Sequence, residues 1–126
     1  NDIELNQYLN GLNKVREVEI KRLDSFIKSQ SINPSDLDIL KIDTQGFEPE
    51  VLKGAGKILS NFDLVITELM FYDFYERQLS FFDIEKYLIP AGFKLYDISH
   101  ISKNPMNGRT DWVDIIYINK SLYERN

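Results

Sequence analysis

Residues 37–48 read LDILKIDTQGFE, and the fold of the chain can be worked out from this stretch. Residues 37–42 are mostly apolar, which predicts a short strand buried on both of its faces. A loop is expected over 43–46, where Gly46 permits a tight turn with positive φ. Pro49 predicts the first turn of a helix, because its missing N–H needs no partner there. The stretch therefore predicts a strand–loop–helix unit of an α/β domain.

The C-terminal side of this unit continues the alternation of helices and strands. The helix is expected to reach about Leu59, because its apolar residues recur at the helical period: Val51, Leu52, Ala55, Ile58 and Leu59. A second buried strand is predicted over 62–70, and Ser80 or Asp83 is expected to cap a helix that ends at Leu88. Strands are then predicted over 93–101 and 112–118, joined by the turn-rich loop 102–110.

This order of elements determines the expected sheet. Strands that alternate with helices predict parallel pairing with right-handed crossovers. The last two strands are joined without a helix, so we expect them to be antiparallel and the sheet to be mixed. The chain of 126 residues suits a single domain, 1–126.

The N-terminal side is less regular. Residues 1–14 predict a short amphipathic helix, and the alternating stretch VREVEIKRL at 15–23 predicts a half-exposed strand. Asp24 is expected to cap a helix to about Gln30, and a turn is expected at 32–35 because the residue before a proline avoids the helical region.

Composition excludes several classes of partner. The net charge is −5 and the basic residues are scattered among acids, so neither nucleic acid nor an anionic membrane surface is an expected partner. No apolar run approaches the roughly 18–20 residues of a membrane-spanning helix. The chain has no cysteine, which excludes disulfides and thiolate metal sites and fits a reducing, cytoplasmic location.

Ligands of open α/β sheets bind outside the carboxyl ends of the strands, and this rule selects the candidate site residues. Asp43 and Glu68 end two successive predicted strands, and either carboxylate is a candidate general base. Gly46 would let a ligand approach the loop, and Glu48 either contributes to the site or only favours the start of its helix.

Each of the other candidate residues at the same edge could serve packing instead of function. His100 and Trp112 could contact a substrate or serve packing, and Tyr72 belongs to an aromatic run that could line a pocket. A lone histidine does not make a metal site of the usual kind, so no metal is expected. Lys41, Glu68 and Asp114 interrupt apolar strands and could form a buried ionic cluster, which we expect to be structural.

The segments 37–59 and 64–69 together resemble the FkbM family of S-adenosylmethionine-dependent methyltransferases. The family pattern is a strand ending in Lys-Ile-Asp, a following Gly and Glu, a Val-Leu-x-Gly-Ala helix, and a strand ending in Glu. The matching residues are Lys41, Ile42, Asp43, Gly46, Glu48, Val51, Leu52, Gly54, Ala55 and Glu68. The common family form has Glu before the Gly, whereas this chain has Gln45.

The resemblance implies a Rossmann-like methyltransferase fold, of which 37–43 and 62–70 would be the fourth and fifth strands. It implies methyl transfer from S-adenosylmethionine to a hydroxyl of a sugar, glycan or natural product. Asp43 would lie beside donor and acceptor and orient or deprotonate the acceptor hydroxyl, and Thr44 would lie near the donor. Gly46, Glu48, Tyr72, His100 and Trp112 would then belong to the acceptor side.

One part of the family pattern is missing. No glycine-rich loop precedes residue 37, and residues 1–36 are too short for the strands that would carry it. We therefore expect the chain to be the C-terminal part of the domain and to be inactive by itself. One face and one edge of its sheet would then be exposed, which would allow a homo-oligomer. The alternative is a non-catalytic α/β binding or assembly module. A hydrolase is a weaker alternative, because no G-x-S-x-G motif is present.

Overall fold

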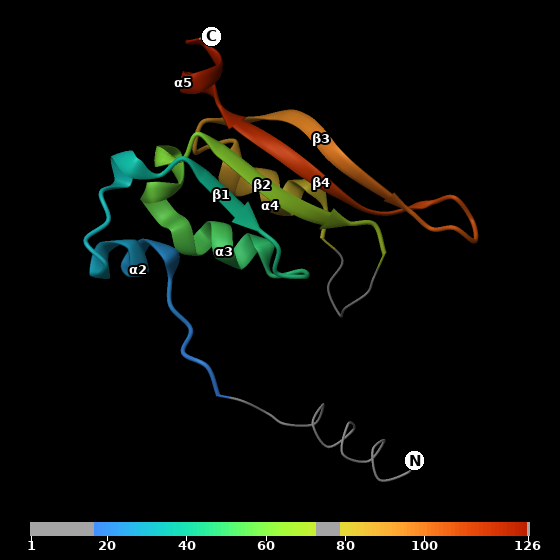
Figure 1. Cartoon of the computed structure of the whole chain (residues 1–126), viewed down its shortest axis with the longest axis horizontal. Coiled ribbons are helices and arrows are strands. Elements are labelled where there is room, and N and C mark those ends of the chain that lie inside the picture. The colour runs from blue at the N-terminus through green and yellow to red at the C-terminus, as the bar shows by residue number, and fades with distance from the viewer. Residues whose placement is uncertain (1–16, 73–78, 126) are drawn as a thin grey trace.

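The computed structural model describes residues 17–72 and 79–125. Four strands form one sheet in the order β1-β2-β4-β3 (Figure 1). β1 pairs with β2 in parallel, and β4 is antiparallel to both of its neighbours. The predicted mixed sheet with an antiparallel closing pair is thus confirmed. The strands are β1 Ile39–Ile42, β2 Leu64–Met70, β3 Phe93–Lys103 and β4 Thr110–Asn119.

The principal helices gather on one side of this sheet, where α3 and α4 lie together (Figure 1). α2 packs against α3, and a 3-10 helix, η2, continues α3 toward β2. In the described part of the chain, no helix is both long and apolar enough to cross a bilayer. The helical segments are α2 Leu23–Ser29, η1 Pro34–Asp36, α3 Glu48–Ala55, η2 Gly56–Asn61, α4 Phe81–Leu88 and α5 Lys120–Tyr123.

The core lies between the helices and one face of the sheet. Along β2, Val65, Thr67 and Leu69 are buried while the residues between them are only half-buried. This alternation shows that one face of β2 is covered more fully than the other. The core cluster also contains Leu52, Leu59, Ile84, Leu88, Ile115 and Tyr117.

β1 does not have the expected burial on both faces. Ile39 keeps 55% of its surface exposed, and Lys41 is exposed as well. Both residues lie on the face opposite the helices, because they alternate with Leu40 and Ile42, which pack into the core. The apolar run therefore predicted the burial of only one face correctly, because no helix of the described residues covers the other face. We call it the open face.

Two predictions for the N-terminal side are wrong. The predicted strand at 15–23 has no strand structure over 17–22, where Val18 and Ile20 are 77% and 86% exposed, and Leu23 already begins α2. Asp24 lies in the first turn of α2, and the N-cap is Arg22, with which the Asp24 carboxylate forms an ion pair. The predicted helix at 1–14 lies outside the described residues, as does most of the 71–79 connection.

The two helices that flank the site agree with the sequence signals. Pro49 occupies the first turn of α3, and the residues of the predicted apolar stripe are buried or half-buried. The α-helix ends at Ala55 and not near Leu59, so Ile58 and Leu59 lie in η2. Gly56 has φ of +54° and ends α3. At the start of α4, Ser80 and Asp83 form a capping box, in which the Asp83 carboxylate accepts a hydrogen bond from the backbone N–H of Ser80. The Ser80 hydroxyl lies 3.0 Å from the same carboxylate oxygen.

Candidate functional site

The loop after β1 is held by one buried carboxylate. Glu48, the first residue of α3, is only 2% exposed. Its Oε1 accepts hydrogen bonds from the backbone N–H and the hydroxyl of Thr44, both at 3.1 Å, and its Oε2 accepts one from the N–H of Gly46 at 2.9 Å. Because these donors belong to the loop itself, the Glu48 side chain fixes the path of the chain immediately after Asp43.

Gln45 links the carboxylates at the ends of β1 and β2. Its Nε2 donates to Asp43 Oδ1 at 3.0 Å and to Glu68 Oε1 at 3.4 Å. Its backbone has φ of +54°, a conformation that non-glycine residues adopt rarely and that here accompanies this side-chain position. A glutamate at 45 could not donate these bonds, so the amide holds together two groups that would otherwise repel each other.

The strand register extends this pair into a row across the sheet. Ile42 lies opposite Thr67, so the next residues along the parallel strands, Asp43 and Glu68, are neighbours as well. Glu68 is the register partner of Asp114, and Asp114 is the partner of His100. Directly paired residues point to the same face of a sheet. Asp43, Glu68, Asp114 and His100 therefore follow one line across all four strands on the open face, and we call them the carboxylate row.

The environment of Glu68 raises the pKa of its carboxyl. Burial is the main cause that raises the pKa of this carboxyl, and the negative charges of Asp43, Asp114 and Glu48 raise it further. Lys41 opposes the shift. A carboxyl with a raised pKa holds a proton more readily than an exposed glutamate does, which is the property needed in a group that accepts a proton from a substrate.

The buried ionic cluster predicted for Lys41, Glu68 and Asp114 does not form. The Lys41 side chain is 61% exposed, and its ammonium lies 3.6 Å from Asp43 Oδ2. Only Glu68 and Asp114 are half-buried, and they are neighbours of the same sign. The open face explains the difference, since a lysine there reaches water without leaving the sheet.

The remaining predicted residues lie around this line. Trp112 is half-buried and pairs with Met70, one row nearer the carboxyl end of β2. Tyr72 follows shortly after β2, and the guanidinium of Arg109 lies 4.9 Å from its ring centre. Thr44 and Gly46 contribute to the loop described above. The register places Glu68, His100 and Trp112 on the open face, while Glu48, Thr44 and Gly46 belong to the loop between β1 and α3. The individual roles of these candidates stay predictions.

Sequence reasoning did not identify two contributors. Gln45 received no role of its own, although a polar residue between Asp43 and Gly46 was a signal of loop contacts. Asp114 was expected to be structural, and its place beside Glu68 and His100 depends on strand register. In the described residues, no group of three or more His, Cys, Asp or Glu side chains is arranged to hold a metal ion.

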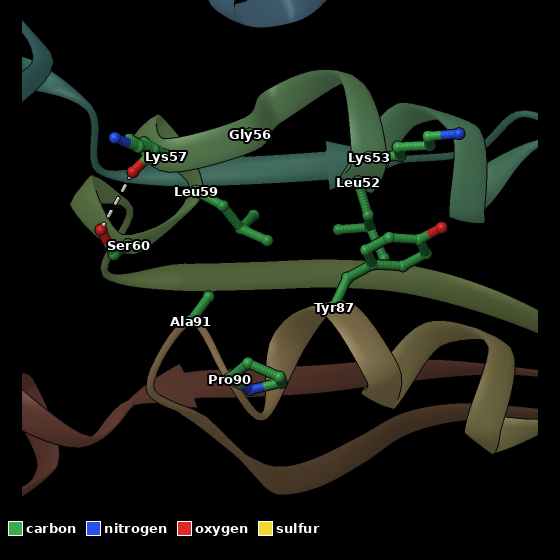
Figure 2. Close-up of a pocket in the computed structure, with 9 residues that line it drawn as sticks. All are labelled: Leu52, Lys53, Gly56, Lys57, Leu59, Ser60, Tyr87, Pro90 and Ala91. Carbon is green, nitrogen blue, oxygen red and sulfur yellow. Dashed lines mark hydrogen bonds between the residues drawn. The ribbon is translucent and has the colours of Figure 1, made fainter.

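A cavity of about 640 Å³ lies away from this edge, between α3–η2 and α4 (Figure 2). Leu52 and Leu59 form part of its wall, with Tyr87 on the α4 side and Lys53 and Lys57 on the α3–η2 side. No residue of the carboxylate row lines it. This hollow in the helical layer is therefore separate from the candidate site.

Comparison with known proteins gives one finding. The model of the methyltransferase FkbM domain matches residues 3–95, which include β1, the Glu48 loop, β2 and α4. No curated protein and no solved structure is similar enough to the chain to count as a match.

Proposed function

Because this chain belongs to the FkbM methyltransferase domain family, we propose that it transfers a methyl group from S-adenosylmethionine to a hydroxyl of a sugar, glycan or natural product. The observation that carries the proposal is the pair of carboxylates, Asp43 and Glu68, held by one amide at the carboxyl end of adjacent parallel strands. Ligands of α/β sheets bind at this edge.

The geometry supports a division of labour between the two carboxylates. Asp43 would accept a hydrogen bond from the acceptor hydroxyl and orient its oxygen. Glu68 would take up the proton that leaves as the new O–CH₃ bond forms, because a raised pKa makes its carboxylate a stronger base than that of an ordinary glutamate. Glu48 would keep Asp43 in place through the loop, and the buried Glu48 carboxylate itself would not contact the acceptor.

The residues present suit the methyl donor electrostatically. S-adenosylmethionine supplies an electrophilic methyl group on a positively charged sulfur, and the carboxylates of Asp43 and Glu68 would favour that charge. Thr44 would lie next to the donor, although its hydroxyl already donates to Glu48. The adenosine end needs a glycine-rich loop that this sequence does not show. We propose that further strands beside the free edge of β1 would complete the donor site, so that this chain alone would be inactive.

An assembly module is the second candidate, because β1 has no partner on its outer edge among the described residues and Ile39 is exposed on the open face of the same strand. Such an edge can pair with a second copy. We also propose a cytoplasmic location, which the lack of cysteine favours.

Calorimetry with S-adenosylmethionine separates these functions. It should be run on this chain and on a longer product of the same gene that includes any upstream sequence. We expect binding by the longer product and little or none by the 126-residue chain. If neither form binds the donor, the methyltransferase proposal is wrong and the assembly module is favoured.

A further inference from the structure

The backbone of Gln45 has a conformation that is unfavourable for a residue with a side chain. Its φ is +54°, and the next residue, Gly46, has φ of +103°. Glycine adopts positive φ readily, whereas a Cβ there comes too close to the following carbonyl oxygen. Residues held in such strained conformations cluster at functional sites. A glutamine here, in place of a second glycine, therefore indicates a function for its side chain.

The path of the loop does not depend on this side chain. The Glu48 carboxylate accepts hydrogen bonds from the backbone N–H groups of Thr44 and Gly46, which lie on either side of Gln45. These bonds hold the backbone at position 45 and would remain with any side chain there. The Gln45 side chain is exposed, and hydrogen bonds that water can replace contribute little to stability. The stability of the loop therefore does not explain a strained glutamine at this position.

The Gln45 amide instead contacts both candidate reacting groups. Its Nε2 lies 3.0 Å from Asp43 Oδ1 and 3.4 Å from Glu68 Oε1. One amide nitrogen carries two N–H donors, so it can serve two acceptors at once. The first contact has an ordinary hydrogen-bond length and the second is longer, so the amide binds mainly to Asp43 and reaches across to Glu68.

A second partner contacts the other oxygen of Asp43. The Lys41 ammonium lies 3.6 Å from Asp43 Oδ2, whereas Gln45 donates to Oδ1. Because its two oxygens have different partners, the Asp43 carboxylate is held in one orientation. Within the described ranges, Gln45 is the only side chain that is hydrogen-bonded to both Asp43 and Glu68.

The cations of the β3–β4 hairpin do not bridge the two carboxylates. Lys103 Nζ donates to Thr110 Oγ1 at 2.9 Å, and the Arg109 guanidinium lies 4.9 Å from the ring centre of Tyr72. The charged groups that shift the pKa of Glu68 are Asp43, Asp114, Glu48 and Lys41. The connection between the two strand ends is therefore made by the uncharged amide of Gln45.

We propose that Gln45 is a positioning residue for methyl transfer, which fixes Asp43 relative to Glu68 through its amide. The proposal rests on the proposed function, since it concerns the carboxylates of the same site. Gln45 acts through these two groups and touches neither the donor nor the acceptor. It keeps two negative groups on adjacent strands at a constant separation, and it does so without adding a charge.

The contact can be tested by NMR on this chain without any ligand. The side-chain amide signals of Gln45 should move as the pH falls through the raised pKa of Glu68, because proton uptake removes the charge of one acceptor. The control is Gln30, whose Nε2 contacts the hydroxyl of Ser29, so its amide signals should stay in place. In Glu68→Gln the movement of the Gln45 signals should be smaller. Gln45 signals that do not respond to pH would overturn the proposal.

Two variants separate positioning from stability. Gln45→Met keeps the length of the side chain and the strained backbone but removes the N–H donors, whereas Gln45→Gly removes the strain as well. Gln45→Met should melt close to the parent. Gln45→Gly should melt no lower than Gln45→Met, because relief of strain offsets the greater freedom of its unfolded chain.

Both variants should nevertheless be poor enzymes. In a product of the same gene that includes any upstream sequence, we expect kcat to fall about tenfold or more, because reacting groups are displaced. The KM for S-adenosylmethionine should stay unchanged, and Gln30→Met should keep the parent kcat. Parent-like kcat in both Gln45 variants would overturn the positioning role, as would a large loss of stability in Gln45→Met, which would show a structural role.

These results can be told apart from a failure of the proposed function. If the parent enzyme transfers no methyl group, the methyltransferase proposal is wrong and the positioning role falls with it, while the NMR titration still decides whether the Gln45 contact exists. If the parent transfers methyl groups and both Gln45 variants do so equally well, only the positioning role is wrong.

Discussion

The carboxylate of Glu48 is buried, but it still determines the conformation of the candidate site. Both of its oxygens accept from the loop that follows Asp43, so one side chain determines where the neighbouring functional group lies. The sequence indicated Glu48 as a site residue or a helix-start residue without choosing between them. The choice needs the hydrogen bonds, because sequence spacing does not show to which side a side chain turns.

Glu48→Gln tests this role. An amide cannot accept at both ends, so either the Gly46 N–H or the two Thr44 donors lose their acceptor in a buried place. We expect the free energy of unfolding to fall by about 2 kcal/mol, as is common when a hydrogen bond to a buried charged group is lost. Urea denaturation measures this, and Glu124→Gln, at an exposed position, is the control. Equal stability of the two variants would refute the role.

Glu68 should make stability depend on pH. Its pKa in the folded chain lies above the ordinary value of 4.5, so in the range just above 4.5 the folded state binds more protons than the unfolded state. Stability linked to this group is therefore highest below that range and falls as the pH rises through the raised pKa.

Glu68→Gln should remove the loss of folding stability that accompanies the rise in pH. We expect the variant to be more stable than the parent at pH 7, by less than about 1 kcal/mol because solvent screens a half-exposed group, and equal to it near pH 4. Urea denaturation at the two pH values gives the comparison. A variant that is less stable than the parent at pH 7 would show that the Glu68 charge is compensated in the fold.

At the scale of elements, local signals succeeded where local chemistry decides the structure. Pro49 in the first turn of α3 and the Ser80–Asp83 pair at the start of α4 are examples. The stretch 15–23 misled because alternation describes a strand only if a neighbouring strand accepts its hydrogen bonds. Val18 and Ile20 are 77% and 86% exposed, and no strand among the described residues pairs with their segment. The exposed side of β1 could not be predicted for a related reason. The sequence of a strand does not show whether another element packs on each of its faces.

Gly54 and Gly56 give a matched test of how α3 ends. Gly56 has φ of +54°, and a Cβ there would meet Asp24 Oδ2 at 2.9 Å, whereas a Cβ at Gly54 would make ordinary contacts of 3.7 Å or more. We expect Gly56→Ala to lower the melting temperature through a strain of about 1–3 kcal/mol. Gly54→Ala, inside the helix, should raise stability by about 0.5–1 kcal/mol. A melting curve for each variant is sufficient, and an effect of the same sign in both would contradict this description.

At the scale of the whole molecule, the site depends on strand order and register. The rule that ligands bind at the carboxyl ends of strands correctly brought Asp43 and Glu68 to one edge, because those strands are parallel. The alignment of Asp114 and His100 with them could not be predicted, since a shift of one residue in β4 or β3 would turn these side chains to the other face. The pairing of strands that are distant in the sequence thus forms the part of the candidate site that could not be predicted from the sequence.

The central proposal is that methyl transfer takes place at Asp43. The most direct measurement is transfer of a labelled methyl group from S-adenosylmethionine to a sugar hydroxyl, by a product of the same gene that includes any upstream sequence. The variant Asp43→Asn is compared with Asp36→Asn. We expect Asp43→Asn to lower the rate by about 10²-fold, as is common when a reacting group is no longer held in position, and Asp36→Asn to leave it unchanged. Equal rates for Asp43→Asn and the parent enzyme would contradict the assignment of the site.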